Sequence, residues 1–143
     1  DGAAFTLVVS EEIVNKLNLK PIAKMLSCAV GGVDPLYMGI GPCVAIPKAL
    51  KQAGIKQNDL EQTELNEAFA VQALAVIKEA RLDPETVNPN GGAIALGHPL
   101  GMTGTRILQT AAIELRKRNK KYALVTMCIG VGQGYATIIE SIK

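Results

Sequence analysis

The sequence predicts an α/β layered domain in which a mostly parallel five-stranded sheet contains one antiparallel strand and carries helices on both faces. Segments with strand character and segments with helical periodicity alternate three times along the chain. The chain then ends with two strands joined by a tight glycine-rich turn, which adds an antiparallel pair to a mostly parallel sheet. With 143 residues, 48% of them hydrophobic, the chain can bury a substantial core, so we expect residues 1–143 to form one domain.

The first elements are a strand, a short helix and a second strand. Residues 4–9 are apolar and predict a strand. Ser10, followed by two acidic residues, predicts the capped start of a helix that ends near Leu17. Residues 22–33 predict a longer apolar strand, and the loop "GGVDPLYMGIGP" follows it.

Two helices and a short strand are expected in the middle of the chain. We expect Pro47 in the first turn of the first helix and Gly54 as its C-cap. Residues 60–65 predict a strand, and residues 68–77 predict a helix that is apolar on nearly every side. We expect most of this second helix to be buried. If the chain has lost a partner layer, one unusually apolar face should be exposed, with self-association as the consequence.

The last elements are one amphipathic helix and two strands. Strands are predicted at residues 122–127 and 135–142, with the turn "CIGVGQG" between them. The helix before them carries small or apolar residues at the helical spacing i, i+3, i+4, i+7, namely Gly104, Ile107, Leu108, Ala111, Ala112 and Leu115.

Composition argues against several classes of partner and site. Fifteen basic and thirteen acidic residues give a net charge of +2, which favours neither nucleic acid nor an anionic membrane surface. No apolar stretch is long enough to span a bilayer. The three cysteines and one histidine form no spacing typical of a disulfide framework or a metal site, so we expect no metal and a reducing compartment. The opening "DGAA" runs directly into a predicted strand, as in a chain that begins within a larger protein.

The stretch "NPNGGAIALGHPLGMTG", residues 88–104, is the most informative part of the chain. It holds the only histidine, His98, between Gly97 and Pro99. Glycine clusters often mark a close approach of backbone to another group. A structural hydrogen-bonding histidine is the alternative, but the position in a loop favours a chemical role.

Three polar residues follow predicted strands or lie in a loop before a helix, where ligands of α/β sheets gather. Asn66, His98 and Cys128 together supply an amide, an imidazole and a thiol, a set suited to acyl-group chemistry. Asn66 could also cap the next helix, and Cys128 could be a buried core thiol. Glycines 130, 132 and 134 favour the chemical interpretation of Cys128, because their bare amides could stabilise an oxyanion. For Cys28 and Cys43 we expect packing roles only.

Five stretches of the sequence resemble the C-terminal motifs of the thiolases. These are "NEAFA" at 66–70, "GGAIALGHPLGMTG" at 91–104, "CIGVGQG" at 128–134, "GVDPLYMGIGP" at 32–42 and the opening "DGAA". The resemblance covers essentially the whole chain, and its wording is slightly closer to degradative 3-ketoacyl-CoA thiolases than to biosynthetic acetoacetyl-CoA thiolases. It implies a thiolase-like layered fold and the C-terminal half of such an enzyme. The nucleophilic cysteine and the loop domain of the family belong to the half that this chain lacks.

The resemblance also implies catalytic roles. His98 would deprotonate the absent nucleophilic cysteine, and Cys128 would exchange a proton with the α-carbon of acetyl-CoA. Asn66 would hold a water that, together with His98, binds the enolate oxygen. The Gly130 amide would contribute to a second oxyanion hole. These roles require His98 and Cys128 to approach each other at one edge of the sheet.

Further expectations concern substrate and partners. Met38 and Phe69 match family positions that line the acyl and pantetheine end, although plain core packing is an equal alternative. Acyl-CoA is then a substrate, and no permanently bound cofactor is expected. The partners would be an N-terminal thiolase half and further copies in a dimer or tetramer, in the cytoplasm of a bacterium or in a eukaryotic organelle of oxidative metabolism. Without the nucleophile, this chain alone should not turn over.

Three other functions remain as alternatives. The first, a biosynthetic acetoacetyl-CoA thiolase, would use the same residues in the synthetic direction, with Cys128 removing the methyl proton. A non-catalytic module that binds acyl-CoA or protein would not need the complete acid–base set of Asn66, His98 and Cys128. A condensing ketoacyl synthase would need a second histidine, and this chain has one.

Overall fold

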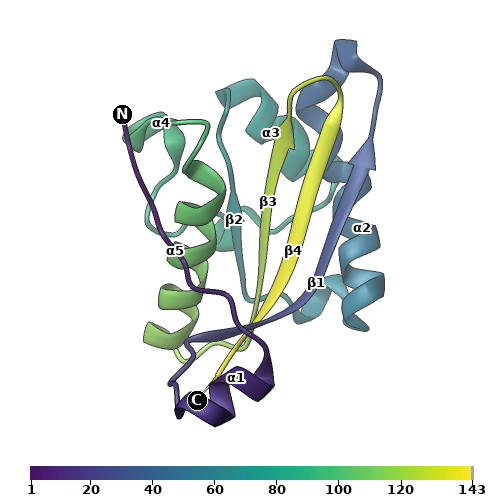
Figure 1. The fold of residues 1–143 in the computed structure, drawn as a ribbon. Coiled ribbons are helices and arrows are strands. Elements are labelled where there is room, and N and C mark those ends of the chain that lie inside the picture. Colours follow the sequence, from purple (N-terminus) through teal and green to yellow (C-terminus); the bar gives the residue numbers. More distant parts are fainter. Residues whose placement is uncertain (143) are drawn as a thin grey trace.

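The computed structural model describes residues 1–142 and shows an open sheet with helices on both faces (Figure 1). Within the described residues the sheet has four strands in the order β1-β4-β3-β2. Their bounds are β1 Ala23–Gly32, β2 Gln62–Leu65, β3 Tyr122–Ile129 and β4 Gln133–Ser141. The predicted α/β layered fold is confirmed.

Strand direction follows the prediction, but strand number does not. β2 is parallel to β3, and β4 is antiparallel to both β3 and β1, so β4 alone opposes the other three strands. The predicted fifth strand, residues 4–9, is wrong: this segment runs extended beside α5 without a strand partner in the described chain. The Gln109 side chain donates a hydrogen bond to the Phe5 carbonyl there. A strand needs a sheet edge to pair with, and this segment lies on a helix.

The helices agree with the predicted segments except at some boundaries. They are α1 Glu11–Leu17, α2 Gly41–Ala53, α3 Ala70–Glu79, α4 Ala93–Leu96 and α5 Thr103–Lys117, with short 3₁₀ turns η1 Pro35–Ile40, η2 Gln57–Asp59 and η3 Pro84–Thr86. Ser10 caps α1 as predicted, accepting a bond from the Ile13 amide at 3.4 Å. α2 begins earlier than predicted, so Pro42 occupies its first turn and Pro47 lies inside the helix. Gly54 ends α2 in the left-handed conformation, as predicted.

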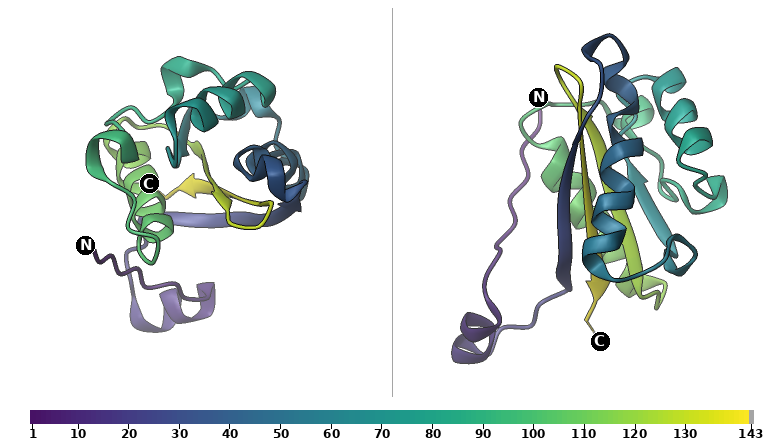
Figure 2. Two further views of the ribbon diagram at one scale, coloured as in Figure 1. Left: turned by 90° about the horizontal axis from the view of Figure 1, so that it is seen from above. Right: turned by 90° about the vertical axis from the view of Figure 1, so that its right-hand side faces the viewer.

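Two apolar cores hold the layers together. α2 packs across β1 and β4 on one face, and α5 packs on β2 and β3 on the other (Figure 2). The core under α2 is the larger, and its fully buried members include Ile46, Leu65, Leu124 and Ile138. The core under α5 includes Ile107, Ala111, Leu115, Val125 and Ile139. α1 buries no residue.

α3 is less buried than its sequence predicts. Its inner side buries Gln72, Ala73 and Val76. Its outer side exposes Val71 by 76% and Leu74 by 67%. The expectation of burial on most sides is therefore wrong for this chain, and the expectation of an exposed apolar face is confirmed. Self-association through it stays a prediction. No helix within residues 1–142 has both the length and the apolar character needed to cross a membrane.

Candidate active site

The carboxyl ends of β2 and β3 place two of the predicted residues at one edge of the sheet, the upper edge in Figure 1. Asn66 directly follows β2, and its backbone N–H donates to the Thr126 carbonyl of β3 at 3.0 Å. Cys128 lies two residues further along β3, close to its end. The loop that carries His98 reaches the same edge, because the His98 ring contacts the Asn66 side chain.

A chain of hydrogen bonds fixes the tautomer of His98. Thr103 donates its hydroxyl proton to the Pro99 carbonyl at 2.9 Å. Since a hydroxyl has one proton, Thr103 Oγ1 must accept from His98 Nδ1, which lies 2.7 Å away. A neutral ring with its proton on Nδ1 has a free lone pair on Nε2, and Asn66 Nδ2 donates to that nitrogen at 3.3 Å. The arrangement therefore presents Nε2 as a base.

Sequence reasoning missed the role of Thr103, which is the first residue of α5 and fully buried. Its side chain orients the imidazole in the way that a second hydrogen-bonding partner commonly fixes a histidine tautomer. The signal was available in the spacing, because Thr103 and Pro99 are four residues apart at the start of a predicted helix.

Two further side chains attach the His98 loop to the end of β2. Asn88 accepts from the Leu65 amide and donates to the Leu65 carbonyl, both at 2.8 Å, so it continues the strand's pairing with a side chain. Glu67 accepts from Asn88 at 2.9 Å and from the Ile94 amide at 3.0 Å. Gly92 lies directly beneath this carboxylate, and a Cβ there would lie 2.3 Å from the Glu67 carboxyl carbon, so a larger residue would displace the Glu67 side chain. The His98 loop is thus held in place by Asn88 and Glu67, which the sequence motifs did not single out as functional residues.

Asn66 does not cap the next helix. The N-cap of α3 is Phe69, and no side chain caps that helix. The capping alternative for Asn66 is therefore wrong, and its amide is free to face His98. The Asn66 residue is 1% exposed, and its Oδ1 has no hydrogen-bond partner among the described residues. A buried orphan acceptor of this kind calls for a donor in the adjoining space.

Cys128 is buried, and its burial raises the pKa of its thiol above the ordinary value. A thiol with a raised pKa is protonated at neutral pH and can act as an acid. Alternation along β3 turns Val125 toward α5 and Leu124 toward α2, so Cys128 begins on the α2 side of the sheet. It makes no hydrogen bond to His98 or Asn66 in the described chain, and their predicted approach stays a prediction. A ligand that contacts both Cys128 and His98 would therefore have to bind beyond the end of β3.

The three glycines after Cys128 have different environments. A Cβ on Gly134 would lie 2.0 Å from the Gly41 carbonyl carbon, and one on Gly132 would lie 2.3 Å from the Val33 oxygen. These two glycines let the turn pack against the start of α2 and the loop before η1, so their predicted role as oxyanion donors lacks support. Gly130 has no atom near its missing Cβ and is exposed. Among these three glycines, Gly130 is therefore the one with open space beside its Cα.

The other predicted positions lie on neighbouring elements. Met38 is half-buried in η1, and Phe69, at the start of α3, is 62% exposed. α3 and η1 are joined by a bond from Gln72 Nε2 to the Gly39 carbonyl at 3.2 Å. Cys28 is exposed on β1 and Cys43 is half-buried on α2, and all three cysteines are free. Within residues 1–142, no three side chains of the metal-binding types cluster.

A cavity of about 150 Å³, lined by both polar and apolar side chains, lies beside Asn66. Its lining includes Glu64 of β2, Asn88 and Asn90 of the loop, and Arg106 of α5. Glu64 is 2% exposed, and burial raises its pKa to about 7, while a hydrogen bond from Gln62 opposes that rise. Sequence reasoning did not single out Glu64, because the strand around it, Gln62–Leu65, is mostly polar and gives no sign that the carboxyl is buried.

Comparison with known proteins explains this assembly. Residues 19–141 match the family described as "Thiolase, C-terminal domain". The chain belongs to this thiolase family. Its motif-derived resemblance to the thiolases is therefore confirmed.

Individual thiolases are close in sequence and structure. The 3-ketoacyl-CoA thiolase of Bacillus subtilis is 53% identical over 140 residues, which are 98% of this chain and 36% of that protein. The 3-oxoadipyl-CoA/3-oxo-5,6-dehydrosuberyl-CoA thiolase of Escherichia coli is 51% identical over 99% of this chain and 36% of that protein. The crystal structure of human mitochondrial 3-ketoacyl-CoA thiolase in complex with CoA superposes with a TM-score of 0.91 at 51% identity, covering 93% of this chain and 34% of that one. This chain thus spans about a third of the length of the relatives that it matches.

Proposed function

We propose that this chain is the acid–base portion of a thiolase that uses coenzyme A to cleave 3-ketoacyl-CoA into acetyl-CoA and a shortened acyl-CoA. The observation that carries the proposal is the hydrogen-bond chain from Thr103 through His98 to Asn66, which presents an unprotonated Nε2 at the sheet edge. Cys128 supports it, because its buried thiol is held protonated. A module that only binds acyl-CoA or protein needs neither feature.

In the first half-reaction, His98 would gain a proton and Cys128 would lose one. His98 Nε2 takes the thiol proton of a cysteine supplied by a segment outside this chain, and the thiolate adds to C3 of the substrate. The C2–C3 bond then breaks, and its electron pair forms the enolate of acetyl-CoA. The Cys128 thiol donates its proton to C2 and becomes a thiolate. His98 and a water held by Asn66 would bind the enolate oxygen.

The second half-reaction would restore both groups. The Cys128 thiolate takes the thiol proton of coenzyme A, whose sulfur attacks the acyl-cysteine carbonyl. The Gly130 amide, with open space around it, would donate to the oxyanion formed there. The departing cysteine recovers its proton from His98, so the site returns to its starting state.

Substrate binding would use the surface beside this edge. Met38 and Phe69 would contact the acyl and pantetheine end, and the exposure of Phe69 leaves its ring available for that contact. Acyl-CoA would be a substrate rather than a resident cofactor. An N-terminal thiolase half would be the partner domain, in a homo-oligomer located in a bacterial cytoplasm or in an organelle of oxidative metabolism.

A domain exchange tests the proposal. The C-terminal third of the Bacillus subtilis 3-ketoacyl-CoA thiolase is replaced by this chain, which is 53% identical to it. The chimera is assayed for thiolysis of acetoacetyl-CoA, longer 3-ketoacyl-CoAs and 3-oxoadipyl-CoA, beside this chain alone and the truncated relative. We expect turnover by the chimera, with 3-ketoacyl-CoA preferred, and none by either part. A folded chimera without turnover on any substrate would refute the proposed function, and turnover by this chain alone would refute the assignment of the nucleophile to another segment.

A further inference from the structure

Glu64 lies in β2, and Asn66 directly follows the end of that strand, two residues further along. Their side chains therefore lie on the same side of the sheet, about 6.6 Å apart along the backbone. Both line the cavity described above. Asn66 contacts His98 through Nδ2, whereas its buried Oδ1 has no partner in the described chain. The orientation of this amide therefore links the cavity to the tautomer of His98.

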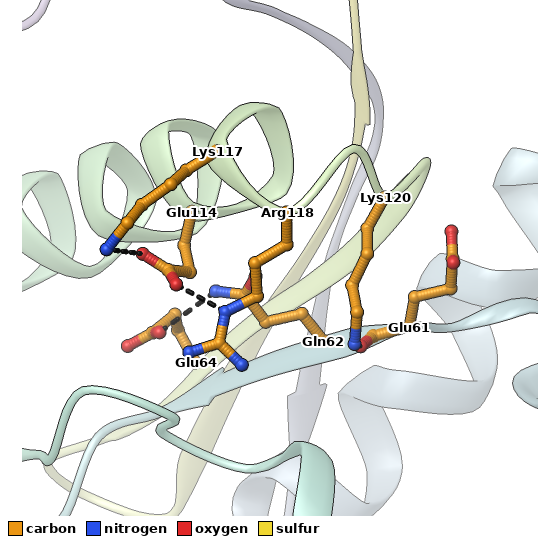
Figure 3. Close-up of polar contacts among 7 residues, drawn as sticks. All are labelled: Glu61, Gln62, Glu64, Glu114, Lys117, Arg118 and Lys120. Atoms are coloured by element: carbon orange, nitrogen blue, oxygen red, sulfur yellow. Dashed lines mark hydrogen bonds and ion pairs between the residues drawn. The ribbon is translucent and has the colours of Figure 1, made fainter.

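The charged side chains around Glu64 are already engaged in other contacts, so the charge of Glu64 itself is what changes in this cavity near neutral pH. On its strand, Gln62 Nε2 donates to Glu64 Oε1 at 3.1 Å (Figure 3). From α5, Glu114 faces it, but that carboxylate is bound by Arg118 and lies 3.9 Å from Lys117 Nζ. Arg106 also acts on Glu64 from α5, while its guanidinium donates to the Gly97 carbonyl at 3.0 Å. Glu67, after β2, is engaged by the loop.

We propose that Glu64 is a positioning residue for His98 and acts through Asn66. An uncharged Glu64 leaves the Asn66 amide with Nδ2 toward His98, and ionisation of Glu64 turns the amide over. This inference deepens the proposed function, because the tautomer concerned is the one that His98 requires as a base.

The physical reason is the interaction between a charge and a dipole that are both buried. A carboxylate attracts the N–H end of the amide, which moves Oδ1 to the side of His98. An oxygen there accepts a proton from Nε2, so His98 shifts to the tautomer with its proton on Nε2. Thr103 then donates to Nδ1 instead of to the Pro99 carbonyl. In that state Nε2 has no lone pair and cannot act as a base.

The test uses the single histidine of the 143-residue chain, whose imidazole gives one set of ¹⁵N NMR signals. These signals distinguish the two neutral tautomers from each other and from the imidazolium. We expect the ratio of the Nδ1–H to the Nε2–H tautomer to fall about fivefold between about pH 6 and about pH 9, the change that the net free energy of one hydrogen bond produces. The transition should coincide with the titration of the Glu64 carboxyl, followed by ¹³C NMR, near pH 7.

Two variants separate positioning from structure. Glu64→Gln keeps the shape and carries no charge, so its tautomer ratio should stay constant over the same pH range. Glu61→Gln removes a charge directly before the same strand and should keep the pH dependence of the unmodified chain. A pH dependence that persists in Glu64→Gln overturns the proposal. If that variant does not fold, a constant ratio in the unmodified chain while Glu64 titrates overturns it equally.

These measurements do not involve turnover. An inactive chimera combined with the expected tautomer change would refute the thiolase proposal and leave this inference standing. An active chimera combined with a constant tautomer ratio would refute this inference alone.

Discussion

Two glycine-rich segments lie at the carboxyl ends of β2 and β3, and they are built differently. The His98 loop, residues 88–104, is held by side-chain hydrogen bonds, and Gly91, Gly97 and Gly101 have open space around them. The Cys128 turn, residues 129–134, is held by close backbone packing at Gly132 and Gly134. Apart from Gly92, which packs under Glu67, the glycines of the first segment leave open space, whereas Gly132 and Gly134 permit close packing in the second. The loop should be sensitive to the loss of single polar atoms, and the turn should be sensitive to added volume.

The largest effect is expected for His98→Ala in the chimeric enzyme. Loss of a general base should lower kcat about a thousandfold. The melting temperature should change little, because His98 is only half-buried and anchors the loop less than Asn88 and Glu67 do. Steady-state kinetics and thermal unfolding measure the two effects. Leu100→Ala, an 81% exposed neighbour in the same loop, is the control and should keep full activity. Retention of turnover within about tenfold in His98→Ala would contradict the assigned role.

The turn is tested by added volume. In Gly134→Ala, the new methyl group would meet the Gly41 carbonyl carbon at 2.0 Å, and backbone on both sides must move. We expect a loss of about 3 kcal/mol in the free energy of unfolding, measured by urea denaturation. Gly130→Ala adds the same group where there is no neighbouring atom and should cost less than about 0.5 kcal/mol. Equal losses at the two positions would show that the turn is not packed as described.

Glu64 gives the pH dependence of stability. Its pKa in the folded chain is raised from 4.5 to about 7, so between these values the folded state keeps a proton that the unfolded state has lost. The resulting stabilisation is complete below about pH 4.5 and disappears as the pH rises through 7. Glu64→Gln removes this dependence. Above neutral pH, we expect the variant to exceed the unmodified chain in stability by up to about 3 kcal/mol.

Urea denaturation at several pH values measures this difference, and Glu61→Gln, near the start of the same strand, is the matched control. If the free energy of unfolding depends on pH in the same way in Glu64→Gln and in the unmodified chain, the pKa of Glu64 does not change on folding, and the prediction is wrong.

The sequence predicted most of the elements because their signals are local. Ser10 and Gly54 marked helix ends correctly, and the alternation of strands and helices predicted the layered fold. Residues 4–9 failed because apolar character indicates a strand without showing whether a sheet edge is available. The predicted burial of α3 was wrong for a different reason. An apolar helix indicates that its surface should be covered, but the sequence does not show whether this chain provides the cover.

The site was predictable only where its chemistry is written into motifs. Asn66 and Cys128 stood out because they follow or end predicted strands, and His98 stood out because it lies in a glycine-rich loop before a helix. Thr103 and Glu64 did not, because their importance depends on which atoms the fold brings within hydrogen-bonding distance. Gly132 and Gly134 could not be told apart from Gly130 for the same reason: a glycine that permits packing and one that has open space beside it look alike in a sequence.

The smallest effect concerns chemical accessibility, and it needs no substitution. If the turn is closed, iodoacetamide should modify Cys28, which is exposed on β1, before Cys128, which is buried and whose raised pKa keeps it in the unreactive thiol form. We expect a rate difference of at least about tenfold, since thiolate fraction and access act in the same direction. Peptide mass spectrometry after timed alkylation measures it. Diethyl pyrocarbonate should modify His98 under the same conditions, because the open loop leaves the imidazole half-exposed. Cys128 reacting as fast as Cys28 would mean that the turn opens in solution, and packing at Gly132 and Gly134 would then no longer distinguish it from the loop.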